Sequence, residues 1–374
     1  MLDAFEHTTL PDSGYSAFMS QYVSNNGHTI NRTKLSADFL AMMGGKDGTI
    51  NRPSYFRDAD VDPKRTAEAI KLFSAAYNDA AFAKTGNPRE ALKVMAKLLD
   101  LEQNGGKKLF VYNNAGKSGS HRSGSTINLC NQTVDIRDYS TVIHETGHYL
   151  FDHVLSEKIP TGFPSVRQLA LDNLYSPHNS GVLKIVKSNI SEVKMFCEYK
   201  STTAVASTLA KKGYPSINAY KKHLVDVYSA RSTADRVSSL LDSTTQAGDM
   251  LVTSFDKKIR PNFGFDDALN CANLELNSMR NKVTDSINRK TGSFTDITGM
   301  INTLTMSHED LWYGHPREYF EGAPNPIRNV YHELMADYTA LRVKGDTKSI
   351  GLLRHLFGED MMDMLEKTYQ DMLK

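Results

Sequence analysis

The sequence predicts a predominantly helical α+β fold with a small sheet, and three observations lead to this prediction. Apolar residues recur every three to four positions over much of the chain, the pattern of helices that bury one face. Two short segments, Leu109–Tyr112 and Ser125–Cys130, have the composition of strands instead. A motif with two histidines, His144–His148, lies in an apolar stretch without proline, which predicts a buried helix with a functional role.

The first 100 residues are expected to form a mostly helical docking region. Residues 1 to about 60 are rich in Asn, Gly, Ser and Asp, which predicts short helices and loops. From Asp62 the apolar spacing becomes helical, with Ala67, Ile70, Leu72, Phe73 and Tyr77 on one face. Asn87 and Pro88 then begin a second helix that continues to Leu101.

A Gly/Ser/Lys-rich stretch from Asn104 to Ser125 surrounds the first predicted strand and precedes the second. Within it, Ala115–Ser118 matches the end of a phosphate-binding loop. The full pattern requires glycine where this chain has Val111, and no helix follows the stretch. A mobile loop without a phosphate site is the prediction.

The second half of the chain predicts helices in two blocks. Residues 156–294 are polar and mostly helical, for example Val193–Lys211 and Pro215–Leu241, and residues 295–374 form helices between Gly/Pro turns. We expect core packing from the last apolar pattern, which comprises Ile350, Leu352, Leu353, Leu356, Met361, Met364 and Leu365.

Composition excludes several classes of function. The 44 Lys and Arg residues nearly balance 43 Asp and Glu, so no global field favours nucleic acid or an anionic membrane. Cys130, Cys197 and Cys271 are far apart and odd in number, which predicts reduced, buried thiols. No apolar run approaches about 18 residues, and the first residues lack the basic and apolar regions of a secretion signal. We therefore expect a soluble protein.

The motif His-Glu-Thr-Gly-His at 144–148 predicts a zinc site. Two histidines four residues apart lie on one face of a helix, so both imidazoles of His144 and His148 can bind one Zn²⁺. Glu145 beside them is placed to deprotonate a water held by the metal. Asp138 or Ser140 is the expected N-cap of this helix.

A catalytic zinc site normally takes a third protein ligand, and the sequence offers few. The metzincin extension fails because Phe151 and Val154 occupy its glycine and histidine positions, and His153 is one residue out of step. A glutamate about 20 residues downstream is absent, since Glu157 is the only glutamate nearby. Asp172 remains a minor alternative, although the Gly-Thr expected before it is missing.

Glu333 is the preferred third ligand. Glu333 and Asp337 lie four residues apart in an apolar helical stretch, so both carboxylates share one face. One can bind the metal while Asp337 accepts an N–H from a ligating histidine. His332 is expected to be a neighbour. Upstream, His315 and Tyr319 are candidate donors to an oxyanion beside the metal.

Taken together, these segments resemble the zincin-like (gluzincin) metallopeptidase domains of bacteriophage head and head-morphogenesis proteins. More distantly, they are similar to the catalytic domain of anthrax lethal factor. The resemblance rests on three motifs and covers about residues 105–155 and 294–374. It implies a catalytic domain over residues 101–374, with residues 156–294 as a long helical insertion. The motifs that carry it are Ser140–His148, Tyr313–Phe320 and His332–Tyr338.

The resemblance implies a zinc-dependent endopeptidase that cleaves a protein substrate. His144, His148 and Glu333 would hold the zinc, and Glu145, His315 and Tyr319 would act in catalysis. The partners would be phage head or virion proteins, and the location the virion or the host cytoplasm. Two rival functions stay open: a non-catalytic structural or injected head protein, and an effector peptidase that attacks a host protein.

The predicted strand Ser125–Cys130 is expected to be the edge along which an extended substrate pairs its backbone.

Overall fold

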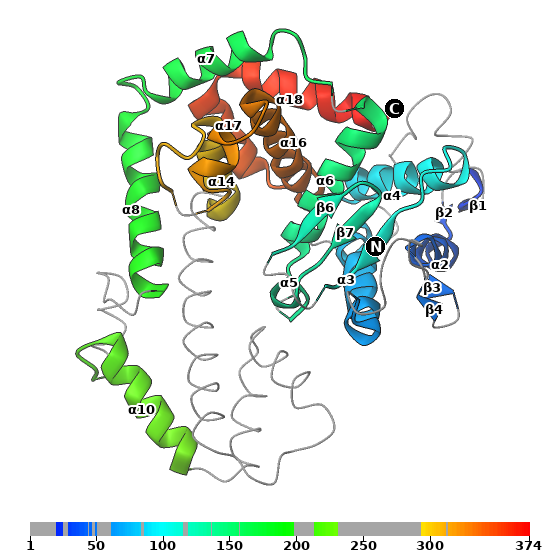
Figure 1. Ribbon diagram of the computed structural model, residues 1–374, viewed down its shortest axis with the longest axis horizontal. Coiled ribbons are helices and arrows are strands. Elements are labelled where there is room, and N and C mark those ends of the chain that lie inside the picture. The colour runs from blue at the N-terminus through cyan, green and yellow to red at the C-terminus, as the bar shows by residue number, and fades with distance from the viewer. Residues whose placement is uncertain are drawn as a thin grey trace.

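The computed structural model shows a mostly helical molecule with one three-stranded sheet, which confirms the predicted α+β class (Figure 1). None of its described helices is both long and apolar enough to cross a membrane. Several predictions fall wholly or partly outside the described residues: the short helices and loops of the first 60 residues, the Ala115–Ser118 loop, the thiols of Cys197 and Cys271, and much of the insertion at 156–294, including the ends of the helices predicted to reach 211 and 241. The structure describes residues 20–24, 29–43, 45–46, 49–50, 61–83, 86–114, 119–135, 137–156, 158–197, 213–230, 293–311 and 313–374.

The first described segment contains one helix and two hairpins. Helix α2 (Arg32–Met42) is capped by the side chain of Asn31. Strands β1 (Val23–Ser24) and β2 (Thr29–Ile30) pair antiparallel, as do β3 (Gly45–Lys46) and β4 (Thr49–Ile50). The sequence predicts short helices and loops here. That prediction misses the hairpins because two-residue strands are too short to show an alternating pattern.

Helices α3 (Pro63–Phe82) and α4 (Pro88–Gln103) confirm the two predicted helices. Asp62 and Asn87 cap their N-termini, each followed by a proline at the first helical position. Their buried faces join the same apolar cluster as the helices of the second half of the chain. This cluster therefore crosses the boundary that the sequence places near residue 100.

The sheet has the order β5-β7-β6, with β5 (Phe110–Tyr112) parallel and β6 (His121–Ser123) antiparallel to β7 (Thr126–Asn128). The two predicted strands are confirmed as β5 and β7. The expectation that Ser125–Cys130 is an edge is wrong, because β7 pairs with a strand on both sides. The outer strand on the side of helix α6 (Tyr139–Leu155) is β6. Its polar residues give no strand pattern in the sequence.

Helix α6 packs against α16 (Pro326–Lys344) at a very close approach. Asp138 caps α6 by accepting from the backbone N–H groups of Ser140 and Thr141, as one of the two predicted caps. A Cβ at Gly147 would lie 2.7 Å from the Cα of Ala336, so only glycine permits this approach. The crossing brings two segments of the chain that are far apart in sequence side by side.

Several of the remaining helices, mainly those of the last part of the chain, pack against this pair. Helices α17 and α18 bury Leu353, Leu356, Met361 and Leu365, with the other predicted apolar positions partly buried against them. Cys130 is buried and free, as predicted. Helix α10 lies away from the main body, below α8 in the view of Figure 1. The other described helices have the bounds α5 (Asn131–Asp135), α7 (Phe163–Leu174), α8 (Ser180–Cys197), α10 (Ile217–Ala230), α14 (Phe294–Leu304), α15 (Arg317–Glu321), α17 (Thr347–Phe357) and α18 (Glu359–Met372).

Candidate metal centre

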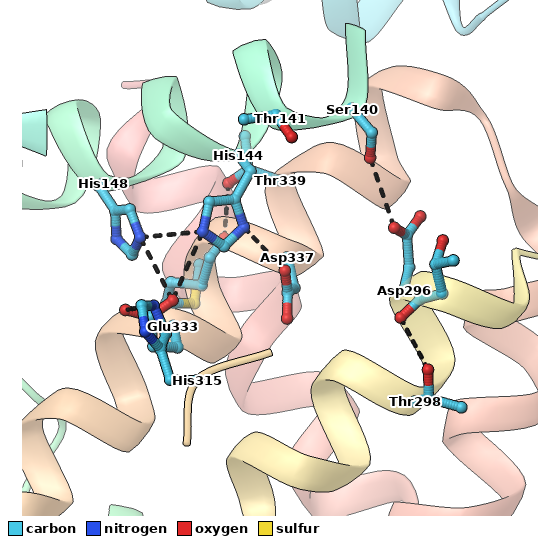
Figure 2. Close-up of polar contacts among 12 residues, drawn as sticks. Ser140, Thr141, His144, His148, Asp296, Thr298, His315, Glu333, Asp337 and Thr339 are labelled. Atoms are coloured by element: carbon cyan, nitrogen blue, oxygen red, sulfur yellow. Dashed lines mark hydrogen bonds and ion pairs between the residues drawn. The ribbon is translucent and has the colours of Figure 1, made fainter. Parts of the chain in front are cut away.

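Two imidazoles of α6 and one carboxylate of α16 converge at the crossing of these helices (Figure 2). The Nε2 atoms of His144 and His148 are 3.1 Å apart. The Oε2 atom of Glu333 lies 3.4 Å from each of them. Only 3% of Glu333 is exposed, so its carboxylate does not belong to a solvated surface stripe.

The spacing of these three atoms suits a tetrahedral zinc ion. With bonds of about 2.0–2.1 Å to nitrogen and oxygen, two vertices of a tetrahedral site lie about 3.3 Å apart. The three observed separations, 3.1, 3.4 and 3.4 Å, all lie close to this value. Two imidazoles and one carboxylate are also a donor set typical of catalytic zinc. The residues present therefore fit the ion that the sequence predicts.

Asp337 fixes the orientation of His144. Its Oδ1 atom is 2.8 Å from Nδ1 of His144, which leaves Nε2 of that ring directed at the other two donors. Burial opposes protonation of His144, but Asp337 and, more weakly, Glu333 hold its pKa well above the ordinary value. A metal ion must therefore displace a proton from His144 when it binds.

Glu333 is held on its second oxygen. The hydroxyl of Tyr319 donates to Oε1 at 2.7 Å, and Nε2 of His315 lies 3.2 Å from the same atom. The rings of His315 and Tyr319 stack with centroids 3.8 Å apart. Despite burial, the surrounding histidines hold the pKa of Glu333 well below its usual range, so the carboxylate is ionised. Oε2 is thereby presented to the two imidazoles of α6.

Glu145 combines burial with a position beside the first histidine. It is 5% exposed, and burial raises its pKa to about 7. The neighbouring charge of Glu333 adds to this rise, while His144 opposes it. A carboxylate with a pKa near neutrality can both accept and return a proton under physiological conditions.

His148 differs from His144 in its surroundings. Burial lowers the pKa of His148 to about 3, so the ring is neutral, the form that binds a metal. Its ring stacks on that of His332 with a centroid distance of 4.1 Å. His332 is therefore a neighbour of the centre, as the sequence predicts, and it bonds to Asp152 with an Nε2–Oδ1 distance of 2.9 Å.

The sequence did not predict that Asp152 and Arg122 lie near the centre. The two side chains form an ion pair with each other. The signal for Asp152 was present, because it follows His148 by four residues and so lies on the same face of α6. Arg122 gave no signal, since a lone arginine in a polar stretch does not indicate a partner.

The alternative third ligand is placed elsewhere. Asp172 is exposed on α7 and accepts a hydrogen bond from Gln168 at 2.9 Å. His153 bonds through Nε2 to the carbonyl oxygen of Gly124 at 3.2 Å. Among the described residues, the group able to hold a metal consists of His144, His148 and Glu333.

Comparison with protein-family models, with curated proteins and with solved structures gave no match.

Proposed function

We propose that this protein is a zinc-dependent endopeptidase of the gluzincin type, with His144, His148 and Glu333 as the metal ligands. The observation that carries the proposal is the convergence of their three donor atoms at separations that suit tetrahedral zinc. The buried Glu145, with a pKa of about 7, adds to this support, because a peptidase of this type needs a base beside the metal.

Zinc bound here would supply Lewis acidity to the scissile carbonyl and to the attacking water. Glu145 takes a proton from this water as its oxygen bonds to the carbonyl carbon. It then returns the proton to the leaving amine as the C–N bond breaks, so one peptide and one water yield a carboxylic acid and an amine. Glu145 ends each cycle in its starting state.

His315 and Tyr319 support a second part of the mechanism. Both donate to the same oxygen of Glu333, so one can turn to the substrate oxygen while the other keeps the ligand in place. A donor directed at developing negative charge is worth about 10²–10³ in kcat when removed.

The outer strand β6 is the proposed edge for an extended substrate, in place of β7. The substrate would be a protein, and the setting a phage virion or its host cytoplasm, where the enzyme would process head or virion proteins. This setting is proposed only from the resemblance of the three sequence motifs to phage head peptidase domains.

The test measures two quantities, the zinc content of the purified protein and its cleavage of a protein substrate. We expect one zinc per chain by elemental analysis of the purified protein, and loss of that zinc in His148→Ala and Glu333→Ala. Cleavage of denatured casein should stop in Glu145→Gln, which retains zinc. Full activity in Glu145→Gln, or stoichiometric zinc in Glu333→Ala, would contradict the mechanism.

The substrate can be identified by labelling new amino termini after incubation with virion proteins or with host-cell extract. Cleaved virion proteins support a role in maturation, whereas cleaved host proteins point to an effector. A zinc-loaded protein that cleaves no substrate in either mixture would instead indicate a structural head protein.

A further inference from the structure

The two histidines of the candidate centre are supported unequally. A histidine that binds a metal almost always donates its other N–H to a carboxylate, a carbonyl or a water. His144 follows this rule through Asp337. The Nδ1 atom of His148 is buried and has no hydrogen-bond partner within the described part of the protein. No described protein group therefore sets the plane of this ring through a hydrogen bond to Nδ1.

The ring of His332 lies where it can do so. It comes from α16, directly before Glu333, and faces His148 with an angle of 26° between the two ring planes. The His148 ring is 6% exposed, so this stacked neighbour covers one of its faces inside the protein. Stacked aromatic rings stabilise each other by about 0.5–1.5 kcal/mol beyond their burial.

His332 is itself held in place. Its Nε2 atom is 2.9 Å from Oδ1 of Asp152, which lies on α6 one turn beyond His148. The other oxygen of Asp152 forms an ion pair with Arg122 of β6. The side chain of Asp152 is only 4% exposed, and a buried carboxylate is stable only when it is paired in this way. Arg122 is anchored in turn by a 3.1 Å bond from Nε to the carbonyl oxygen of Gly124.

We infer that Arg122, Asp152 and His332 form a series of positioning residues that fixes the ring of His148 by stacking, where no described protein group bonds to its Nδ1 atom. This series begins with Arg122 on β6, continues with Asp152 on α6 and ends with His332 on α16, so it joins β6 to the two helices that carry the proposed ligands. The inference rests on the proposed zinc site and concerns the affinity for zinc, not the hydrolytic reaction.

The test measures the affinity of the purified full chain for Zn²⁺ by competition with a chelator. His332→Ala should bind zinc about 10–100-fold more weakly, the range typical of lost outer-shell support. His332→Phe keeps a flat ring against His148 and should stay within about threefold of the wild type. His308→Ala is the matched control, because His308 is about half exposed and pairs with Glu321 instead.

Asp152→Asn separates positioning from a general loss of packing. It should lower the affinity for zinc as His332→Ala does. The double variant Asp152→Asn/His332→Ala should lose no more affinity than the more affected single variant, since both residues act through the ring of His332. The absorption spectrum of the Co²⁺-loaded protein should change in His332→Ala and stay unchanged in His308→Ala. Thermal unfolding of the metal-free variants checks that each one folds.

The possible failures are distinct. Unchanged zinc affinity in His332→Ala overturns the positioning role, and so does equal weakening in His332→Ala and His332→Phe. If the losses of zinc affinity of the two single variants add up in the double variant, Asp152 does not act through His332. A wild-type protein that binds no zinc overturns the proposed function itself, and that result is visible before any variant is made.

Discussion

Gly147→Ala tests whether the close crossing of α6 and α16 creates the centre. The added Cβ would lie 2.7 Å from Cα and 3.2 Å from the carbonyl oxygen of Ala336, and 3.1 Å from Cβ of Thr339. Ordinary contacts begin near 3.4 Å, so the two helices must separate by about 0.7 Å. No side-chain rotation can relieve the clash, because the nearest atoms belong to the backbone of α16.

This shift is large compared with what a metal site tolerates. Zinc–ligand distances hold to within about 0.2 Å, and Glu333 is carried by the helix that must move. We therefore expect zinc affinity to fall about 10–100-fold. Overpacking costs about 1–3 kcal/mol, and the better helix propensity of alanine offsets up to about 1 kcal/mol. The free energy of unfolding should thus fall by about 1–2 kcal/mol.

The assay combines urea unfolding of the metal-free protein with chelator competition for zinc. Gly351→Ala is the matched control, since Gly351 lies in the exposed face of α17 and its added Cβ meets nothing within 4 Å. That variant should gain about 0.5–1 kcal/mol and bind zinc normally. If Gly147→Ala instead behaves like Gly351→Ala in both measurements, the reasoning about the crossing is refuted.

Three further predictions concern the charges and donors of the centre. Burial raises the pKa of Glu145 from 4.5 to about 7, so the stabilisation from its bound proton is fully present below pH 4.5 and is lost as the pH rises through 7. Metal-free Glu145→Gln should therefore be more stable than the wild type at pH 8 by up to about 3 kcal/mol, with the two urea-unfolding curves converging towards pH 4. A constant difference across this range would show that burial does not raise the pKa. Asp337→Asn removes the carboxylate that bonds to His144, so zinc should bind about 10–100-fold more weakly in chelator competition, and unchanged binding would reject its role. Tyr319→Phe should lower kcat for peptide cleavage about 10²–10³-fold with zinc still bound, whereas loss of zinc would make Tyr319 an anchor of Glu333 alone.

Local sequence patterns correctly predicted the features that depend only on residues close together in the sequence. The cap at Asp138, the two strands β5 and β7, and the shared face of Glu333 and Asp337 all follow from spacing over a few positions. The geometry then brings Glu333 to the two histidines, as the proposed ligand set requires.

Patterns of this kind do not specify which distant segments meet. The order of the strands depends on β6, whose polar residues carry no alternation, and the sequence therefore placed the substrate edge on the wrong strand. The contact of His332 with Asp152 joins positions 180 residues apart, and no local signal relates them. Gly147 reads in the sequence as a residue that weakens a helix, and only the crossing shows what it permits.

Asp337 follows His144 by 193 positions, so the centre draws on two parts of the chain that are synthesised at very different times. While a ribosome is still making the intervening residues, α6 alone offers a pair of imidazoles, a weak and incomplete binding site. The third donor arrives only when α16 has emerged and docked. Under the proposed function, peptide hydrolysis would thus be withheld from the nascent chain and from neighbouring polypeptides until α16 has docked on α6.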